Sequence, residues 1–130
     1  MGSRFTELVI DSHDRRGLAL FWCDVLGYRI VDETDAAVEI GGKEFSAEDA
    51  RGGPVPPTLI FVAVPEGKTV KNRVHIDVSP IDRDHESEVQ RLLDLGARRV
   101  DVGQGSAPWA VLADPEGNEF CVLRSLAPDP

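Results

Sequence analysis

The sequence predicts an α+β fold built from two consecutive modules, each with the order strand, helix, strand, strand, strand. A short apolar run precedes each of two amphipathic helical patterns, each pattern ends at a glycine, and three strand-like runs follow it. The segments around these glycines, VLGYRIV at Gly27 and DLGARRV at Gly96, align at an offset of 69 residues. A repeat of only two units favours two halves that share one sheet surface over a solenoid. We therefore expect a single domain over residues 1–130, with modules at about 4–66 and 71–126.

The first module begins with the run ELVIDS at residues 7–12, which is short and apolar at its centre, as a buried strand is. An amphipathic helix is predicted next, because Asp14 can cap its start, apolar residues recur at helical spacing and Gly27 can end it. Three strand-like runs follow, at residues 28–34, 36–42 and 57–64.

A long polar stretch at residues 41–57, GGKEFSAEDARGGPVPP, lies before the last of these strands. Its glycines and prolines predict a loop. A compact domain seldom keeps so long a loop without a use, which favours a lid or a partner-facing segment. A mobile surface excursion explains the same residues, and both interpretations stay open.

The second module repeats the order of the first. A strand is predicted at residues 73–80 and a helix at 81–96, with Gly96 as its stop. A turn is predicted at residues 114–118, where Asp114 precedes a proline and is expected to shape the turn. The remaining strands are expected at residues 97–103, 109–114 and 118–123.

Composition narrows the classes of function. The 130 residues are 42% hydrophobic, enough for one core, and the net charge of −9 with no basic run disfavours nucleic acid as a partner. No apolar stretch is long enough to span a bilayer and no secretory leader pattern opens the chain, so we expect a cytoplasmic protein with no membrane partner. The two cysteines form no CxxC pattern, which suits a reducing compartment.

Three segments carry a resemblance to a known family: LVIDSHDRRGLALFWCDVLGYRIV in the first half, and KTVKNRVHIDV with WAVLADPEGNEFCVL in the second. In these the chain resembles the vicinal oxygen chelate superfamily, which holds glyoxalase I, extradiol dioxygenases and bleomycin-resistance proteins. It looks most like the glyoxalase-like subgroup of actinobacterial type. The resemblance implies that each module curls its sheet into half of a cleft, and that in the metalloenzymes a divalent ion sits there on residues from both modules.

The resemblance also places the family's metal positions on this chain. Glu7 takes the first-strand position, His75 is its counterpart in the second module, and Cys121 stands where glyoxalase I has a glutamate. The fourth position falls near Phe61 or Val62, which offer no ligand. The resemblance thus implies at most an incomplete site for one divalent ion (Zn, Ni, Mn or Fe), held by Glu7 and His75. A Cys121 thiolate as third ligand would favour zinc.

Each candidate residue also has a simpler explanation. His75 is either a ligand or catalytic group or a hydrogen-bonded cleft histidine, and Glu7, a carboxylate on an apolar strand, is either functional or half of an ion pair. If the two approach each other, they could act as a general base without any metal. Cys121 suits a small apolar core position. Asp77 shares the face of His75 by strand alternation and is a spare carboxylate for ligand binding.

Two aromatic residues complete the candidate set. Trp109 and Phe61 lie on predicted strands that would line the cleft, where flat rings can hold an apolar or aromatic ligand. Core packing explains Phe61 equally well. No GxGxxG, P-loop or serine-nucleophile context is present in the sequence, so nucleotide hydrolysis and acyl transfer have no support.

Two hypotheses of function follow. The first is a glyoxalase-like protein with a degenerate metal site, which binds a small apolar or aromatic molecule in its cleft, with Cys121 among the lining residues. The second is a metal-dependent lyase, isomerase or dioxygenase that uses Glu7 and His75. The resemblance implies a homodimer in either case, and an apolar C-terminal strand with an edge to cover agrees with it.

Overall fold

The computed structural model describes residues 2–100 and 109–128. The chain divides into two compact units, Met1–Gly67 and Lys68–Pro130. The N-terminal unit contains β1 (Glu7–Ser12), α1 (Arg15–Leu26), β2 (Arg29–Glu33), β3 (Ala37–Gly41), α2 (Ala47–Gly52) and β4 (Thr58–Ala63). The C-terminal unit contains β5 (Ile76–Val78), α3 (His85–Leu95), β6 (Arg98–Arg99), β7 (Ala110–Ala113) and β8 (Glu119–Val122). Among the described residues, no helix has the length and apolar character needed to cross a membrane.

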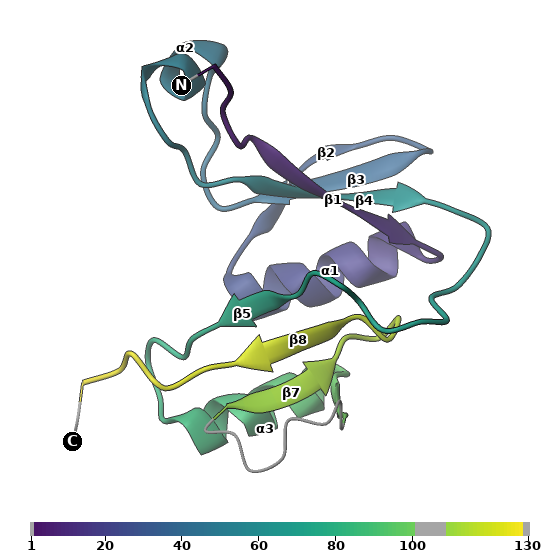
Figure 1. The fold of residues 1–130 in the computed structure, drawn as a ribbon, viewed down its shortest axis with the longest axis vertical. Helices are drawn as coiled ribbons and strands as arrows, with labels where there is room; N and C mark the ends of the chain where they lie inside the picture. The colour runs from purple at the N-terminus through teal and green to yellow at the C-terminus, as the bar shows by residue number, and fades with distance from the viewer. Residues whose placement is uncertain (1, 101–108, 129–130) are drawn as a thin grey trace. The chain divides into compact units, whose positions relative to one another are not determined.

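Each unit is a four-stranded mixed sheet with one long helix along one face, as Figure 1 shows for α1 and for α3. The strand orders are β1-β4-β3-β2 and β5-β8-β7-β6. In both sheets the first strand of the module is therefore followed by its fourth, third and second strands. In both sheets the first and last strands of the module pair in parallel, and the other pairs are antiparallel. The predicted α+β fold of two βαβββ modules is confirmed.

The long helices begin and end at residues whose chemistry suits those positions. The side chain of Asp14 accepts a hydrogen bond from the Gly17 N–H at the start of α1, and Asp84 does the same for the Ser87 N–H at the start of α3. Gly27 follows α1 with φ of 69°, in the left-handed region that glycine adopts without strain. The predicted cap and stop of the first helix are confirmed.

The core of the N-terminal unit lies between α1 and the sheet. The helix contributes the stripe Leu18, Ala19, Phe21, Trp22 and Val25. Along β4, Leu59 and Phe61 are buried with register partners Ile40 and Val38, which are also buried. Because side chains alternate along a strand, the residues between them, among them Ile60, face away from α1. The N-terminal sheet therefore has one packed face and one open face.

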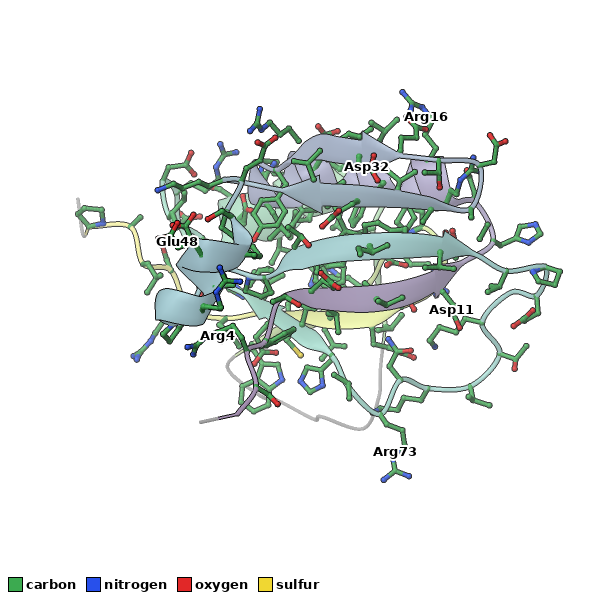
Figure 2. The ribbon with its side chains drawn as sticks, turned by 90° about the horizontal axis from the view of Figure 1, so that it is seen from above. Arg4, Asp11, Arg16, Asp32, Glu48 and Arg73 are labelled. Atoms are coloured by element: carbon green, nitrogen blue, oxygen red, sulfur yellow. The ribbon has the colours of Figure 1, made fainter. Side chains whose placement is uncertain are left out.

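The polar stretch at residues 41–57 is not all loop, because it contains the six-residue helix α2. A capping box starts α2: the Ser46 hydroxyl accepts a hydrogen bond from the Asp49 N–H, and the Asp49 carboxylate accepts one from the Ser46 N–H. Arg4 lies beside this helix and donates from Nε to the Ala50 carbonyl at 2.7 Å (Figure 2). The prediction of an irregular loop was therefore wrong over Ala47–Gly52. The lid interpretation stays a prediction.

Two predicted strands are shorter than expected. The run at residues 73–80 forms strand only over Ile76–Val78, and the run at 97–103 only over Arg98–Arg99 within the part of the chain that the structure describes. Residues 101–103 of that run lie outside the described residues.

Candidate ligand and metal site

The open face of the C-terminal sheet, the face turned away from α3, gathers the residues of the candidate site. Asp77 on β5 and Val111 on β7 are both register partners of Cys121 on β8, one from each side. Phe120 and Val122 alternate with Cys121 along β8 and are buried in the core with α3. Cys121 is thus the central floor residue of this face, between a carboxylate and an aliphatic side chain.

A pocket of about 340 Å³ opens over this floor. One part of its lining is apolar and comes from Trp109, Val111 and Leu123. The rest, apart from the Cys121 thiol, is polar and comes from Lys71, Asn72, His75, Asp77 and Glu119. All nine of these lining residues belong to the C-terminal unit.

Three potential metal ligands converge in this pocket. The ligand atoms of His75, Asp77 and Cys121 all lie within 4.8 Å of one another. His75 Nε2 lies 3.3 Å from Asp77 Oδ1, and both side chains are about half exposed, at 49% and 46%. Cys121, in contrast, is 8% exposed. The arrangement offers one imidazole, one carboxylate and one sulfur to an incoming ion or ligand.

The Cys121 thiol is held in its neutral form in the absence of a cation. Burial raises the pKa of this thiol, and the charge of Asp77, together with the hydrogen bond that the thiol donates to it, raises that pKa further. Lys71 acts weakly in the opposite direction. Cys121 is therefore a poor nucleophile at neutral pH, since the thiolate is the reactive form. Both Cys121 and Cys23 are free cysteines.

Glu119 fixes one wall of the pocket. Its carboxylate accepts a hydrogen bond from Lys68 Nζ at 2.9 Å and another from the Asn72 backbone N–H at 3.0 Å, which ties the segment before β5 to β8. Burial acts to raise the pKa of Glu119, but the Asn72 N–H and the Lys68 ammonium outweigh it and leave this pKa lowered. The sequence analysis did not identify Glu119 as a site residue. Its position two residues before Cys121 places both on the same strand face and could have indicated it.

Replacing Glu119 with glutamine is expected to lower the free energy of unfolding by about 1–2 kcal/mol, because hydrogen bonds to a charged acceptor are the stronger ones. Urea denaturation of wild type and Glu119→Gln measures the change. Glu66→Gln, which alters an exposed carboxylate, is the matched control and should leave stability unchanged. Equal stabilities of Glu119→Gln and wild type would show that the Glu119 carboxylate does not stabilise the fold.

The structure places the other predicted residues in the N-terminal unit. Glu7 opens β1 opposite Thr58 and is exposed. Because Glu7 and His75 belong to different units, a Glu7–His75 pair stays a prediction. Phe61 is 0% exposed, so it has no surface to offer a ligand, and we assign it to the core. Glu39, missed in the sequence, accepts a hydrogen bond from the Thr58 hydroxyl at 2.6 Å.

Solved structures similar to this one share its fold at low sequence identity. A point mutant of the fosfomycin resistance protein FosX from Listeria monocytogenes, in complex with Mn(II) and 1S,2S-dihydroxypropylphosphonic acid, is 11% identical with a TM-score of 0.66, over 96% of this chain and 92% of that one. Glyoxalase I from Leishmania major is 16% identical with a TM-score of 0.61, over 95% and 87% of the two chains. A bleomycin-binding protein complexed with bleomycin is 17% identical with a TM-score of 0.56, over 95% and 98%.

These likenesses show that the fold is shared with a glyoxalase I, a bleomycin-binding protein and an enzyme of the glyoxalase/bleomycin resistance protein/dioxygenase family, and the actinobacterial subgroup stays a prediction. A search of curated protein sequences finds no match. The sequence model of the glyoxalase-like domain matches residues 7–123, nearly the whole chain. This chain therefore belongs to the glyoxalase-like domain family.

Proposed function

We propose that this protein binds a small molecule with an apolar or aromatic part in the pocket of its C-terminal unit. The observation that carries the proposal is a pocket of about 340 Å³ in which Trp109, Val111 and Leu123 meet a set of polar side chains. Small-molecule sites commonly have volumes of roughly 300–1,000 Å³, with mostly apolar walls and a few placed polar groups. The pocket agrees with that description in both size and lining.

The lining also suggests how a ligand would be oriented. Trp109 is 41% exposed, so its indole has free surface against which an apolar or aromatic group can pack. His75, Asp77 and Lys71 would meet the polar end of the ligand. The bleomycin-binding protein, which has the same fold, is named for a small-molecule ligand, and this supports the proposal by analogy of fold only.

Replacing Trp109 with leucine is expected to weaken binding of an apolar aromatic probe by about tenfold or more, because the indole supplies the largest apolar contact. Anilinonaphthalene sulfonate is a suitable probe, followed by a panel of planar aromatic acids and amines. Fluorescence titration in the presence of a chelator measures the affinity without metal. Trp22, the other tryptophan, is buried and remains as an internal reference.

Leu20→Ala, which removes an exposed apolar side chain from α1 in the other unit, is the matched control and should bind the probe as wild type does. No binding of any probe by the wild type, or equal affinity in wild type and Trp109→Leu, would overturn the pocket as the binding site.

The second candidate function is a metal-dependent lyase, isomerase or dioxygenase that uses Glu7 and His75. The observation that favours it is the convergence of His75 with Asp77 and Cys121, since a bound divalent ion polarises a carbonyl or stabilises an enediolate. A hard ion needs three or four nitrogen and oxygen donors, and this cluster offers two besides sulfur. The enzyme would therefore need Glu7, and loss of metal binding in Glu7→Gln would make it the primary function. The homodimer and the cytoplasmic location remain expectations.

A further inference from the structure

We propose that the ligand of this pocket is a zwitterion with an aromatic part, the chemical class to which the aromatic α-amino acids belong. Lys71 meets the carboxylate of this ligand, Asp77 meets its ammonium group and Trp109 packs against its ring. The inference deepens the proposed function, on which it rests for the location of the site.

The Glu119 carboxylate is already used within the protein. Its Oε1 accepts a hydrogen bond from Lys68 Nζ at 2.9 Å, and its Oε2 accepts one from the Asn72 backbone N–H at 3.0 Å. The side chains of Glu119 and Lys68 are only 15% and 18% exposed. Glu119 therefore contributes to the shape of the pocket, while Lys68 neutralises its charge.

Asp77 is the carboxylate that is available to a ligand. It accepts a hydrogen bond from the Cys121 thiol, and its Oδ1 lies 3.3 Å from His75 Nε2. Neither partner carries a fixed positive charge, and no lysine or arginine among the described residues forms an ion pair with Asp77. Because its side chain is about half exposed, a cationic group of a ligand can reach it.

Lys71 supplies the opposite charge. Its side chain is exposed and lines the same pocket, and its Nζ donates a hydrogen bond to an uncharged group, the Asn72 carbonyl, at 3.3 Å. Within the described parts of the chain, no carboxylate forms an ion pair with it. Its charge is felt at the pocket floor, where it lowers the pKa of the Cys121 thiol against the larger effects of burial and of Asp77.

The pocket thus presents two opposite charges that form no ion pair with each other. An α-amino acid carries an ammonium group and a carboxylate on one carbon, so it can meet both charges at once. A ligand with a carboxylate alone would bring a second negative charge towards Asp77, and a ligand with an amine alone would bring a second positive charge towards Lys71. The exposed surface of Trp109 then receives the aromatic part.

The experiment compares ligands that differ only in their charged groups. Chelator-treated protein is titrated by calorimetry with L-phenylalanine, with 3-phenylpropanoate, which lacks the ammonium group, and with phenethylamine, which lacks the carboxylate. L-Tryptophan, indole-3-propanoate and tryptamine form a second series. In at least one series, wild type should bind the amino acid about fivefold or more tightly than either analogue, which is the upper end of what an exposed ion pair contributes.

Two variants assign the charges to residues. Lys71→Met should abolish the preference for the amino acid over the amine, because nothing then recognises the carboxylate. Asp77→Asn should abolish the preference for the amino acid over the propanoate. Arg73→Met removes an exposed cation that lies two residues after Lys71 and does not line the pocket, so this matched control should keep both preferences.

The outcomes separate the ligand class from the proposed function. If wild type binds anilinonaphthalene sulfonate but binds neither amino acid, or binds an analogue as tightly as the amino acid in both series, the pocket stands and the zwitterion is overturned. Preferences that survive in Lys71→Met and Asp77→Asn would also overturn it. If wild type binds neither the dye nor any compound of the two series, both the proposed function and this inference fail.

Discussion

Replacing Asp114 with alanine is expected to lower the free energy of unfolding by about 3–5 kcal/mol, because one buried carboxylate organises the whole β7–β8 turn. Asp114 is 1% exposed. Its Oδ1 accepts hydrogen bonds from the backbone N–H groups of Glu116 at 3.0 Å and Asn118 at 2.9 Å. The Asn118 side-chain amide lies 3.1 and 3.0 Å from its two oxygens. Alanine would leave these donors without an acceptor.

Urea denaturation of Asp114→Ala and wild type tests this expectation, with Asp114→Asn as a graded variant. Asparagine keeps one carbonyl oxygen, so it should retain part of the network and fall between the two. Asp35→Ala, in the exposed β2–β3 turn, is the matched control for a turn aspartate without that burial. A loss below about 1 kcal/mol in Asp114→Ala would show that the turn holds without its carboxylate.

Replacing Phe61 with alanine is expected to lower the free energy of unfolding by about 3–5 kcal/mol, the usual range for truncating a buried phenylalanine. Phe61 is fully buried in β4, on the sheet face that packs on α1, with the buried Val38 as its register partner. The cavity left by the ring would lie inside the core of the N-terminal unit, where water cannot compensate for lost contacts. The pocket of the C-terminal unit does not include this ring.

Phe61→Leu and Trp109→Leu form the decisive pair, because leucine keeps enough volume at position 61 for the protein to fold. Phe61→Leu should lose stability but keep its affinity for anilinonaphthalene sulfonate, whereas Trp109→Leu should show the reverse. Equal weakening of probe binding in the two variants would show that Phe61 contributes to ligand binding after all.

Local signals were sufficient for most of the fold. A cap, a helical stripe and a glycine stop predicted α1, and each acts within a few residues of its neighbours. The Asp114 turn was predicted for the same reason, since its proline and glycine fix the backbone locally. The short helix α2 was not predicted because six residues that end in a glycine carry too little periodicity, although Ser46 and Asp49 match the pattern of a capping box.

The site depended on information that local patterns do not contain. The grouping of Cys121 with His75 and Asp77 requires the pairing of β5 with β8, two segments far apart in the chain. The run that holds Phe61 is almost entirely apolar, so it shows no alternation from which its packed face could be read. The link from Glu119 to the Asn72 N–H spans 47 positions and leaves no trace in the composition of either segment.

The parallel pairing of first and last strands also determines the order in which each unit can form. β1 lies at the edge of its sheet with β4 as its strand neighbour, and Glu7 meets Thr58 across that pair. During synthesis β4 emerges from the ribosome after β2 and β3. The β2–β3 hairpin can therefore form by local contacts before β1 has its strand partner β4. The second unit has the same arrangement, because β5 pairs with β8, the last strand of that unit. Each βαβββ unit therefore closes its sheet through its least local contacts, the kind of contact that is expected to slow folding.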